Sequence, residues 1–267
     1  MVVLVTIWPL QSLAQEKISV KREVIEEGMF TKEERLLKTY PIEKSSSGLS
    51  FDSLPVIQSF PSPTNLPRGL EHDGNYLYTC QATDVPGEKD LIFKIDPNTG
   101  DTVETYEWTL SDFPMGIAWD GTNFYVSDDS FEGKIQVVDT NFNYVREIDA
   151  PEDWQRDLAF DGTYLLEATS YSDKIWTLNP LNGSVINVFD SPLDWPAGVA
   201  WDGSHIWHSN SEFLGDNDYI YKLNTAGNII EQYRAPGTYP NGLAFDGQYL
   251  WVIDWDTDTI YKLQPPE

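Results

Sequence analysis

The sequence predicts an all-β protein, a five-bladed β-propeller of four-stranded antiparallel blades. Three observations support this prediction. One pattern recurs five times, each copy contains short apolar stretches separated by turn residues, and one strand-like stretch precedes the first copy. The copies align on Asp-Gly pairs that begin at Asp73, Asp120, Asp161, Asp202 and Asp246, so the repeat lengths are 47, 41, 41 and 44 residues. Short β-rich repeats of this length are typical of a propeller.

The last copy shows the strands of one blade most clearly. Residues 242–245 (GLAF) and 249–252 (YLWV) flank the Asp-Gly pair, a combination typical of a hairpin. Residues 260–263 (IYKL) predict a third strand, and in the first copy residues 101–107 (DTVETYE) follow a turn as a fourth. Apolar and aromatic residues occupy both faces of these strands, as expected where each blade packs between two neighbours.

The ring needs a closing strand, because the last copy stops after its third strand, at Leu263. Residues 55–60 (PVIQSF), just before the first copy, have the right pattern. We expect this segment to pair with the last blade, since that pairing closes the ring without an open edge.

Two segments precede the propeller, which we assign to residues 51–267. Residues 1–14 contain the short apolar run 2–9, followed by small residues at positions 12 and 14, the spacing that a signal peptidase accepts. We therefore expect a signal peptide and a secreted or periplasmic protein; the alternative for this run is a buried strand. Residues 15–50 carry seven basic and seven acidic side chains without a sustained apolar period, which predicts a charged, mobile linker.

The charge of the chain excludes one class of partner. Its 43 acidic and 17 basic residues give a formal net charge of −26, which repels phosphate backbones, so we expect no nucleic-acid partner. One cysteine, Cys80, excludes an intrachain disulfide and a cysteine-based zinc cluster, and three histidines argue against a multi-histidine metal site. We also expect no membrane span and no cofactor.

The loops that enter the first strand of each blade gather on one face of a propeller, the usual binding surface. The residue before this entry is aromatic in four of five copies: Phe113, Trp154, Trp195 and Tyr239. Three of these rings follow an aspartate, and an aromatic rim with carboxylates suits a cation, an amine or a sugar ring. The alternative is that the rings wedge between blades and only stabilise the fold.

A second set of residues faces the mouth of the channel on that loop face. Arg68, Arg156 and Asn241 are its polar members, and we take them as ligand-binding candidates. The two arginines could bind a ligand carboxylate through paired hydrogen bonds, or they could neutralise neighbouring aspartates.

Alternate carboxylates at Asp254, Asp256 and Asp258 are the candidates for a calcium site, although this run lacks the glycine and the later glutamate of an EF-hand.

Four ionisable residues depart from the repeat pattern. Glu71 and His72 replace the alanine and the aromatic residue that the other copies carry on their first strand, and Glu167 and His208 stand where two other copies carry valine. A glutamate and a histidine could form an acid/base pair, so these four are the catalytic candidates. Equally, each could be a buried, hydrogen-bonded group without a chemical role.

The opening of the propeller, residues 55–78 (PVIQSFPSPTNLPRGLEHDGNYLY), resembles that of the plant and bacterial glutaminyl cyclases, or glutamine cyclotransferases, and the likeness continues through residues 91–106. The resemblance implies a five-bladed propeller. Its implication for activity is weaker, because Arg68 stands where that family has glutamine, and Thr79 and Met115 stand where it has glutamates. Loss of two carboxylates would remove the proton transfers that cyclisation needs. The later blades share only a general pattern, also seen in YWTD and gluconolactonase-like propellers.

Together these observations favour an exported, non-catalytic binding module that holds a small molecule, a peptide N-terminus, a sugar or a protein on its aromatic and acidic loop face. Two alternatives stay open. One is an enzyme with its site at the channel, either a diverged glutaminyl cyclase or a lyase or lactonase. The other is a scaffold in a larger surface assembly.

Overall fold

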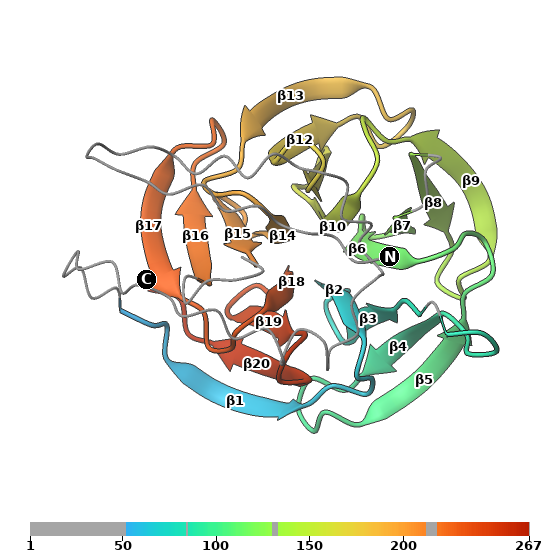
Figure 1. The fold of residues 1–267 in the computed structure, drawn as a ribbon, viewed down its shortest axis with the longest axis horizontal. Helices are drawn as coiled ribbons and strands as arrows, with labels where there is room; N and C mark the ends of the chain where they lie inside the picture. Colours follow the sequence, from blue (N-terminus) through green and yellow to red (C-terminus); the bar gives the residue numbers. More distant parts are fainter. Residues whose placement is uncertain (1–51, 84, 130–132, 212–217, 267) are drawn as a thin grey trace, which may run out of the picture. The chain divides into compact units, whose positions relative to one another are not determined.

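The computed structural model describes residues 52–266, apart from residues 84, 130–132 and 212–217. The signal peptide and linker expected at residues 1–14 and 15–50 lie outside the described residues. The described part confirms the predicted architecture: twenty strands form five four-stranded antiparallel sheets around a central axis (Figure 1). No helix occurs among the described residues, and so none that is long and apolar enough to cross a membrane.

Each of the first four blades consists of four strands that follow one another along the chain. The first blade contains β2 (Pro67–His72), β3 (Leu77–Gln81), β4 (Leu91–Ile95) and β5 (Thr102–Glu107). The second contains β6 (Pro114–Trp119), β7 (Phe124–Asp128), β8 (Lys134–Val138) and β9 (Tyr144–Asp149). The third contains β10 (Gln155–Phe160), β11 (Leu165–Thr169), β12 (Lys174–Leu178) and β13 (Val185–Asp190). The fourth contains β14 (Pro196–Trp201), β15 (Ile206–Asn210), β16 (Tyr219–Leu223) and β17 (Ile229–Arg234).

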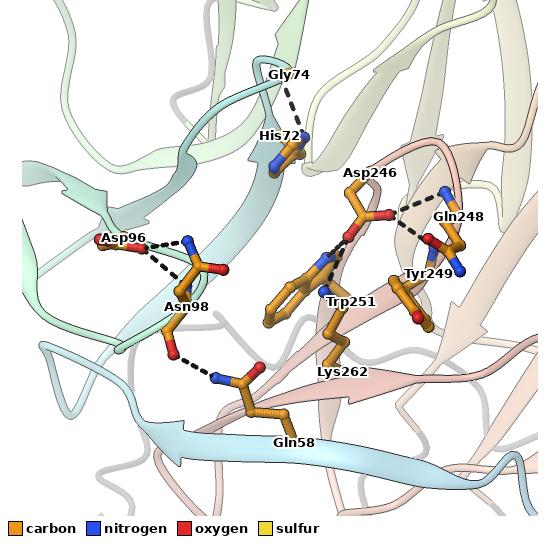
Figure 2. Close-up of polar contacts among 10 residues, drawn as sticks. All are labelled: Gln58, His72, Gly74, Asp96, Asn98, Asp246, Gln248, Tyr249, Trp251 and Lys262. Atoms are coloured by element: carbon orange, nitrogen blue, oxygen red, sulfur yellow. Dashed lines mark hydrogen bonds and ion pairs between the residues drawn. The ribbon is translucent and has the colours of Figure 1, made fainter.

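The fifth blade confirms the predicted closure. It combines β18 (Pro240–Phe245), β19 (Leu250–Asp254) and β20 (Thr259–Leu263) with β1 (Val56–Pro61), which pairs with β20 as the outermost strand. Phe60 lies opposite Ile260 and is buried, with its ring centroid 6.0 Å from that of Trp251. The amide of Gln58 donates to the carbonyl oxygen of Asn98 at 2.9 Å, which joins β1 to the first blade (Figure 2).

The recurring Asp-Gly pair forms the hairpin between the first and second strand of each blade. The glycine follows the aspartate in the turn, with φ between 92° and 99°, a backbone conformation that glycine adopts most readily. Oδ1 of the aspartate accepts the N–H groups two and three residues later; Asp246, for example, accepts from Gln248 at 2.9 Å and Tyr249 at 2.7 Å (Figure 2). Its Oδ2 accepts the indole N–H of Trp251 at 2.8 Å. In four of the five blades one carboxylate thus fixes both the turn and a core ring, whereas Asp161 fixes the turn and the ring position is Leu166.

The innermost strands β2, β6, β10, β14 and β18 approach one another closely around the axis (Figure 1). Four of them carry glycine at the third position, Gly69, Gly116, Gly198 and Gly242, and a Cβ added at any of these would come within 2.6–2.7 Å of a neighbouring atom. Glycine is needed here for close approach of the backbone. The hydrophobic core lies between the blades, in five clusters of buried aliphatic and aromatic side chains.

Candidate functional site

The loop face holds three aromatic residues in an unusual backbone conformation. Phe113, Trp154 and Trp195, each just before the first strand of a blade, have φ values of 57°, 59° and 62°. A bulky side chain rarely adopts positive φ, and the strain is of the order of 1–3 kcal/mol per residue. All three side chains are partly exposed. Such strain gathers at functional sites and persists only where the surroundings enforce it.

Hydrogen bonds on both sides of these residues enforce the conformation. The carbonyl oxygens of Phe113, Trp154 and Trp195 accept the N–H of the residue that follows the second strand of the same blade, at 3.0–3.1 Å. Carboxylates of the preceding blade accept two of the N–H groups, Asp90 from Phe113 and Asp173 from Trp195, both at 3.1 Å. The backbone that carries these rings is therefore fixed by the protein itself.

The fourth predicted rim residue, Tyr239, differs from the other three. It is buried, its N–H donates to Asp254 at 2.6 Å, and its ring lies 5.6 Å from that of Trp255. Its packing fits the alternative in which a ring wedges between blades. Trp154 is more accessible and meets the exposed Tyr171 edge to face at 6.0 Å.

At the mouth of the channel, Asp129 stands out among the charged groups. Burial raises the pKa of its carboxyl group to about 7, the nearby charge of Arg68 opposes this shift, and Asp128 and Asp153 add to it. Its Oδ1 atom is buried without a hydrogen-bond partner within the described residues. A buried carboxylate oxygen without a hydrogen-bond partner is suited to accept a bond from a donor.

The other predicted mouth residues are engaged with the protein itself. Nε of Arg156 donates to Oγ of Ser170 at 2.9 Å, and the amide of Asn241 donates to the carbonyl oxygen of Pro67 at 2.9 Å. Both side chains are buried. Of the candidates in this set, the structure brings Arg68 together with Asp129, whereas Arg156 and Asn241 hold neighbouring loops and strands.

An open acidic cleft of about 760 Å³ lies beside this mouth, between loops of the first two blades. Its lining includes six carboxylate residues and one lysine: Glu88, Lys89, Asp90, Glu107, Asp112, Asp128 and Glu147. Lys89 is paired with Glu107. The remaining charge makes the cleft negative, which favours a cationic ligand.

The predicted calcium candidates are used largely within their own turn. Asp254 accepts hydrogen bonds from Tyr239 and, through its other oxygen, from the N–H and hydroxyl of Thr257 at 2.9 and 2.8 Å. Asp256 accepts from Thr238 at 3.3 Å, and Asp258 adopts φ of 48°. Within the described part of the chain, no group of three or more His, Cys, Asp or Glu side chains is arranged to hold a metal ion. A calcium site here stays an expectation.

The four catalytic candidates lie in three separate places. Glu167 is fully buried in the interface of the second and third blades, where burial raises its pKa well above the usual range, with Glu152 and Asp128 adding to the shift. His208 is buried between the third and fourth blades, where it bonds Ser191 and the carbonyl oxygen of Gly198, both at 2.9 Å, and burial lowers its pKa to about 4. Glu71 and His72 lie at the opposite end of the channel from the loop face, beside the hairpin turns. These positions do not form the acid/base pair that we considered from the sequence.

Asp157 is a residue that the sequence analysis did not single out. It replaces the glycine of the other four innermost strands, so a comparison of the third position of these strands would have found it. Its Oδ2 accepts the N–H groups of Val199 and Leu243 at 3.2 and 3.1 Å, and its Oδ1 points at Gly69. Burial raises its pKa well above the usual range. The carboxyl group of Asp157 thus reaches three other blades and fills the centre of the channel at this level.

Comparisons with known proteins support the fold. No protein-family model and no curated protein matches the chain. Among solved structures, it is similar to glutaminyl cyclase of Myxococcus xanthus, at 13% identity and a TM-score of 0.64 over 80% of this chain and 98% of that one. It is also similar to a chain of a nidogen/laminin complex (18%, TM-score 0.54, 74% and 75%) and to the Cps50 (Swd1) β-propeller domain of Myceliophteria thermophila (9%, TM-score 0.50, 80% and 100%). The resemblance to glutaminyl cyclases is thereby confirmed for the fold, and these identities show the fold alone.

Proposed function

We propose that the chain is a non-catalytic binding module that takes an amine-bearing ligand, such as a peptide N-terminus, on its loop face. The observation that carries this proposal is the buried Oδ1 atom of Asp129, which lacks a hydrogen-bond partner within the described residues. An ammonium group supplies both the missing donor and a charge that compensates the buried carboxylate.

The surroundings of Asp129 support an amine over other ligands. The N–H of Asp129 donates to the carbonyl oxygen of Phe113 at 3.1 Å, so the backbones of these two residues are adjacent, and an aromatic side chain of the loop face belongs to the residue that Asp129 contacts. The acidic cleft attracts cations toward the mouth. Arg68 lies close enough for its charge to act on Asp129, so the amine would bind beside a guanidinium group as well as a carboxylate.

Titration of the protein with a short peptide, followed by tryptophan fluorescence and calorimetry, tests the proposal. The peptide with a free N-terminus should bind, and the same peptide with an acetylated N-terminus should bind at least tenfold more weakly. D129N should cause a similar loss, whereas D101N, at an exposed turn of the first blade, should bind like the parent. Affinity should fall as the pH is lowered through 7, because protonation of Asp129 removes the charge. Equal binding of both peptides would contradict the proposal.

A second candidate function is turnover of a related substrate by a diverged cyclase. The same Asp129 favours it, since a carboxyl group with a pKa of about 7 is suited to exchange a proton near neutral pH. Incubation with peptides that begin with glutamine, followed by mass spectrometry, distinguishes the two. If the parent protein releases ammonia from such a peptide and D129N does not, the protein is an enzyme and the proposal of a non-catalytic binding module is wrong.

We also propose that the protein is exported. The apolar run at residues 2–9 and the small residues at positions 12 and 14 support this. The mass of the mature protein recovered from its native host should correspond to cleavage after residue 14, and an intact N-terminus in a cytoplasmic fraction would refute export.

A further inference from the structure

A small cavity lies on the axis at the end of the channel beside the hairpin turns, away from the loop face. Its volume is about 140 Å³, and its walls include the small side chains of Ala159, Ala200 and Ala244. Glu71 replaces alanine at the equivalent position of the first blade and brings a carboxyl group to the cavity. Asp157 separates this cavity from the mouth on the loop face.

Main-chain N–H groups point into the cavity because the innermost strands have a neighbour on one side only. Along such a strand, alternate N–H groups face the partner strand and the others face the axis. The aspartate that ends each innermost strand donates across its own hairpin, as Asp161, Asp202 and Asp246 do at 3.0–3.1 Å. The residues just before them, Phe160, Trp201 and Phe245, therefore turn their N–H groups, and with them their carbonyl oxygens, away from the partner strand toward the cavity that they line.

Glu71 uses the equivalent N–H groups of the first two blades. Its Oε1 accepts from His72 at 2.7 Å and its Oε2 accepts from Trp119 at 3.0 Å. Burial raises the pKa of Glu71 to about 8, and these two hydrogen bonds oppose the shift. At neutral pH the carboxyl group, which lines the cavity, is mostly protonated, and its O–H is a further donor.

We propose that this axial cavity binds a small monovalent anion, a halide or a carboxylate of formate or acetate size. The N–H groups of Phe160, Trp201 and Phe245 and the protonated Glu71 are its donors. Convergent main-chain N–H groups form anion sites in proteins, and the methyl walls leave room for one small ion. Ionised Glu71 repels an anion, so the anion binds together with the proton of Glu71.

Other charged groups near Glu71 come from three directions. Asp73 lies on its own hairpin and Asp157 on the third blade, and both carboxyl groups favour its protonated form. His72 lies at the junction with the fifth blade, where Asp246 and Lys262 act on it (Figure 2). Its Nδ1 accepts the N–H of Gly74 at 3.2 Å and burial lowers its pKa, so His72 is neutral in the range where Glu71 titrates.

The test uses formate, chloride and bromide as probes, with the sodium salt of a bulky sulfonate as the reference at equal ionic strength. At pH 6 the small anions should raise the melting temperature in a saturable way, and at pH 9 this rise should be lost. A crystal soaked in bromide at pH 6 should show an anomalous peak in the axial cavity. Water alone in the cavity, or the same rise in melting temperature at both pH values, would overturn the proposal.

Two variants of Glu71 separate the site from general salt effects. E71A copies the residue of the other blades and should lose the anion-dependent rise at pH 6. E71Q carries a donor that does not titrate, so it should keep the rise at pH 9. E104A and E104Q, on the exposed strand β5, make the same changes away from the cavity and should behave like the parent. Unchanged anion dependence in E71A would place the ion elsewhere and reject the proposal.

Discussion

Truncation of Phe60 to alanine is expected to lower the free energy of unfolding by about 3–5 kcal/mol, the usual range for a buried phenylalanine. The side chain is 8% exposed and lies between the fifth and first blades, against Trp251, Phe93 and Ile95. The Phe60 ring also packs closely against Gly100, since a Cβ added at Gly100 would lie 2.5 Å from the ring. In a domain of this size 1 kcal/mol shifts the melting temperature by about 2–4 °C, so F60A should melt roughly 6–20 °C lower.

The same strand supplies the control. Ile57 also belongs to β1, but its side chain is 49% exposed, so I57A should change the free energy of unfolding by less than about 1 kcal/mol. Urea unfolding followed by tryptophan fluorescence and by circular dichroism measures both variants. Equal stability losses in F60A and I57A, or no loss in F60A, would refute the claim that β1 closes the ring through its buried face.

Three further predictions concern single positions. G69A should destabilise the protein by about 1–3 kcal/mol in urea unfolding, because its Cβ would meet Asp157 Oδ1 at 2.6 Å and backbone atoms of the second blade. His208, with a pKa of about 4 in the folded state against 6.5 as its ordinary value, should make stability fall as the pH drops from 6.5 to 4, since the unfolded chain takes up the proton first. H208T should flatten that part of the pH–stability profile; an unchanged slope would assign it to another group. D246A should lower the melting temperature more than D161A, because Asp246 also binds an indole N–H and a lysine that Asp161 lacks.

The ring and its closure could be predicted from the sequence because both depend on repetition. Each Asp-Gly pair marks one hairpin, and a copy that ends at Leu263 requires a strand from elsewhere. The shared place of Phe113, Trp154 and Trp195 before the first strand of a blade could also be predicted, since a fixed position in a repeat occupies a fixed place in the ring, whereas the burial of Tyr239 could not. The direction in which a polar side chain points was harder, as Arg156 and Asn241 show: residues at the mouth can bond inward to the protein.

The buried ionisable groups show why the candidate site could be predicted only in part. Glu71 and His208 both depart from the repeat, yet they lie apart in the structure. Glu71 lines the axial cavity, whereas His208 is buried between the third and fourth blades. Asp157 replaces the glycine of the other four innermost strands, but the sequence pattern does not show what its carboxyl group contacts. The role of Asp157 depends on the meeting of the innermost strands at the axis, where its carboxyl group contacts residues up to 86 positions away in the sequence.

The pairing of β1 with β20 has a consequence for synthesis of the chain. Phe60 emerges from the ribosome 200 residues before its partner Ile260. Until the C-terminal strand is available, β1 has no sheet to join, and the nascent chain exposes an unpaired strand together with an incomplete last blade. Completion of the fold therefore waits until β20 has been synthesised, and a product that stops short of β20 leaves β1 available to other chains.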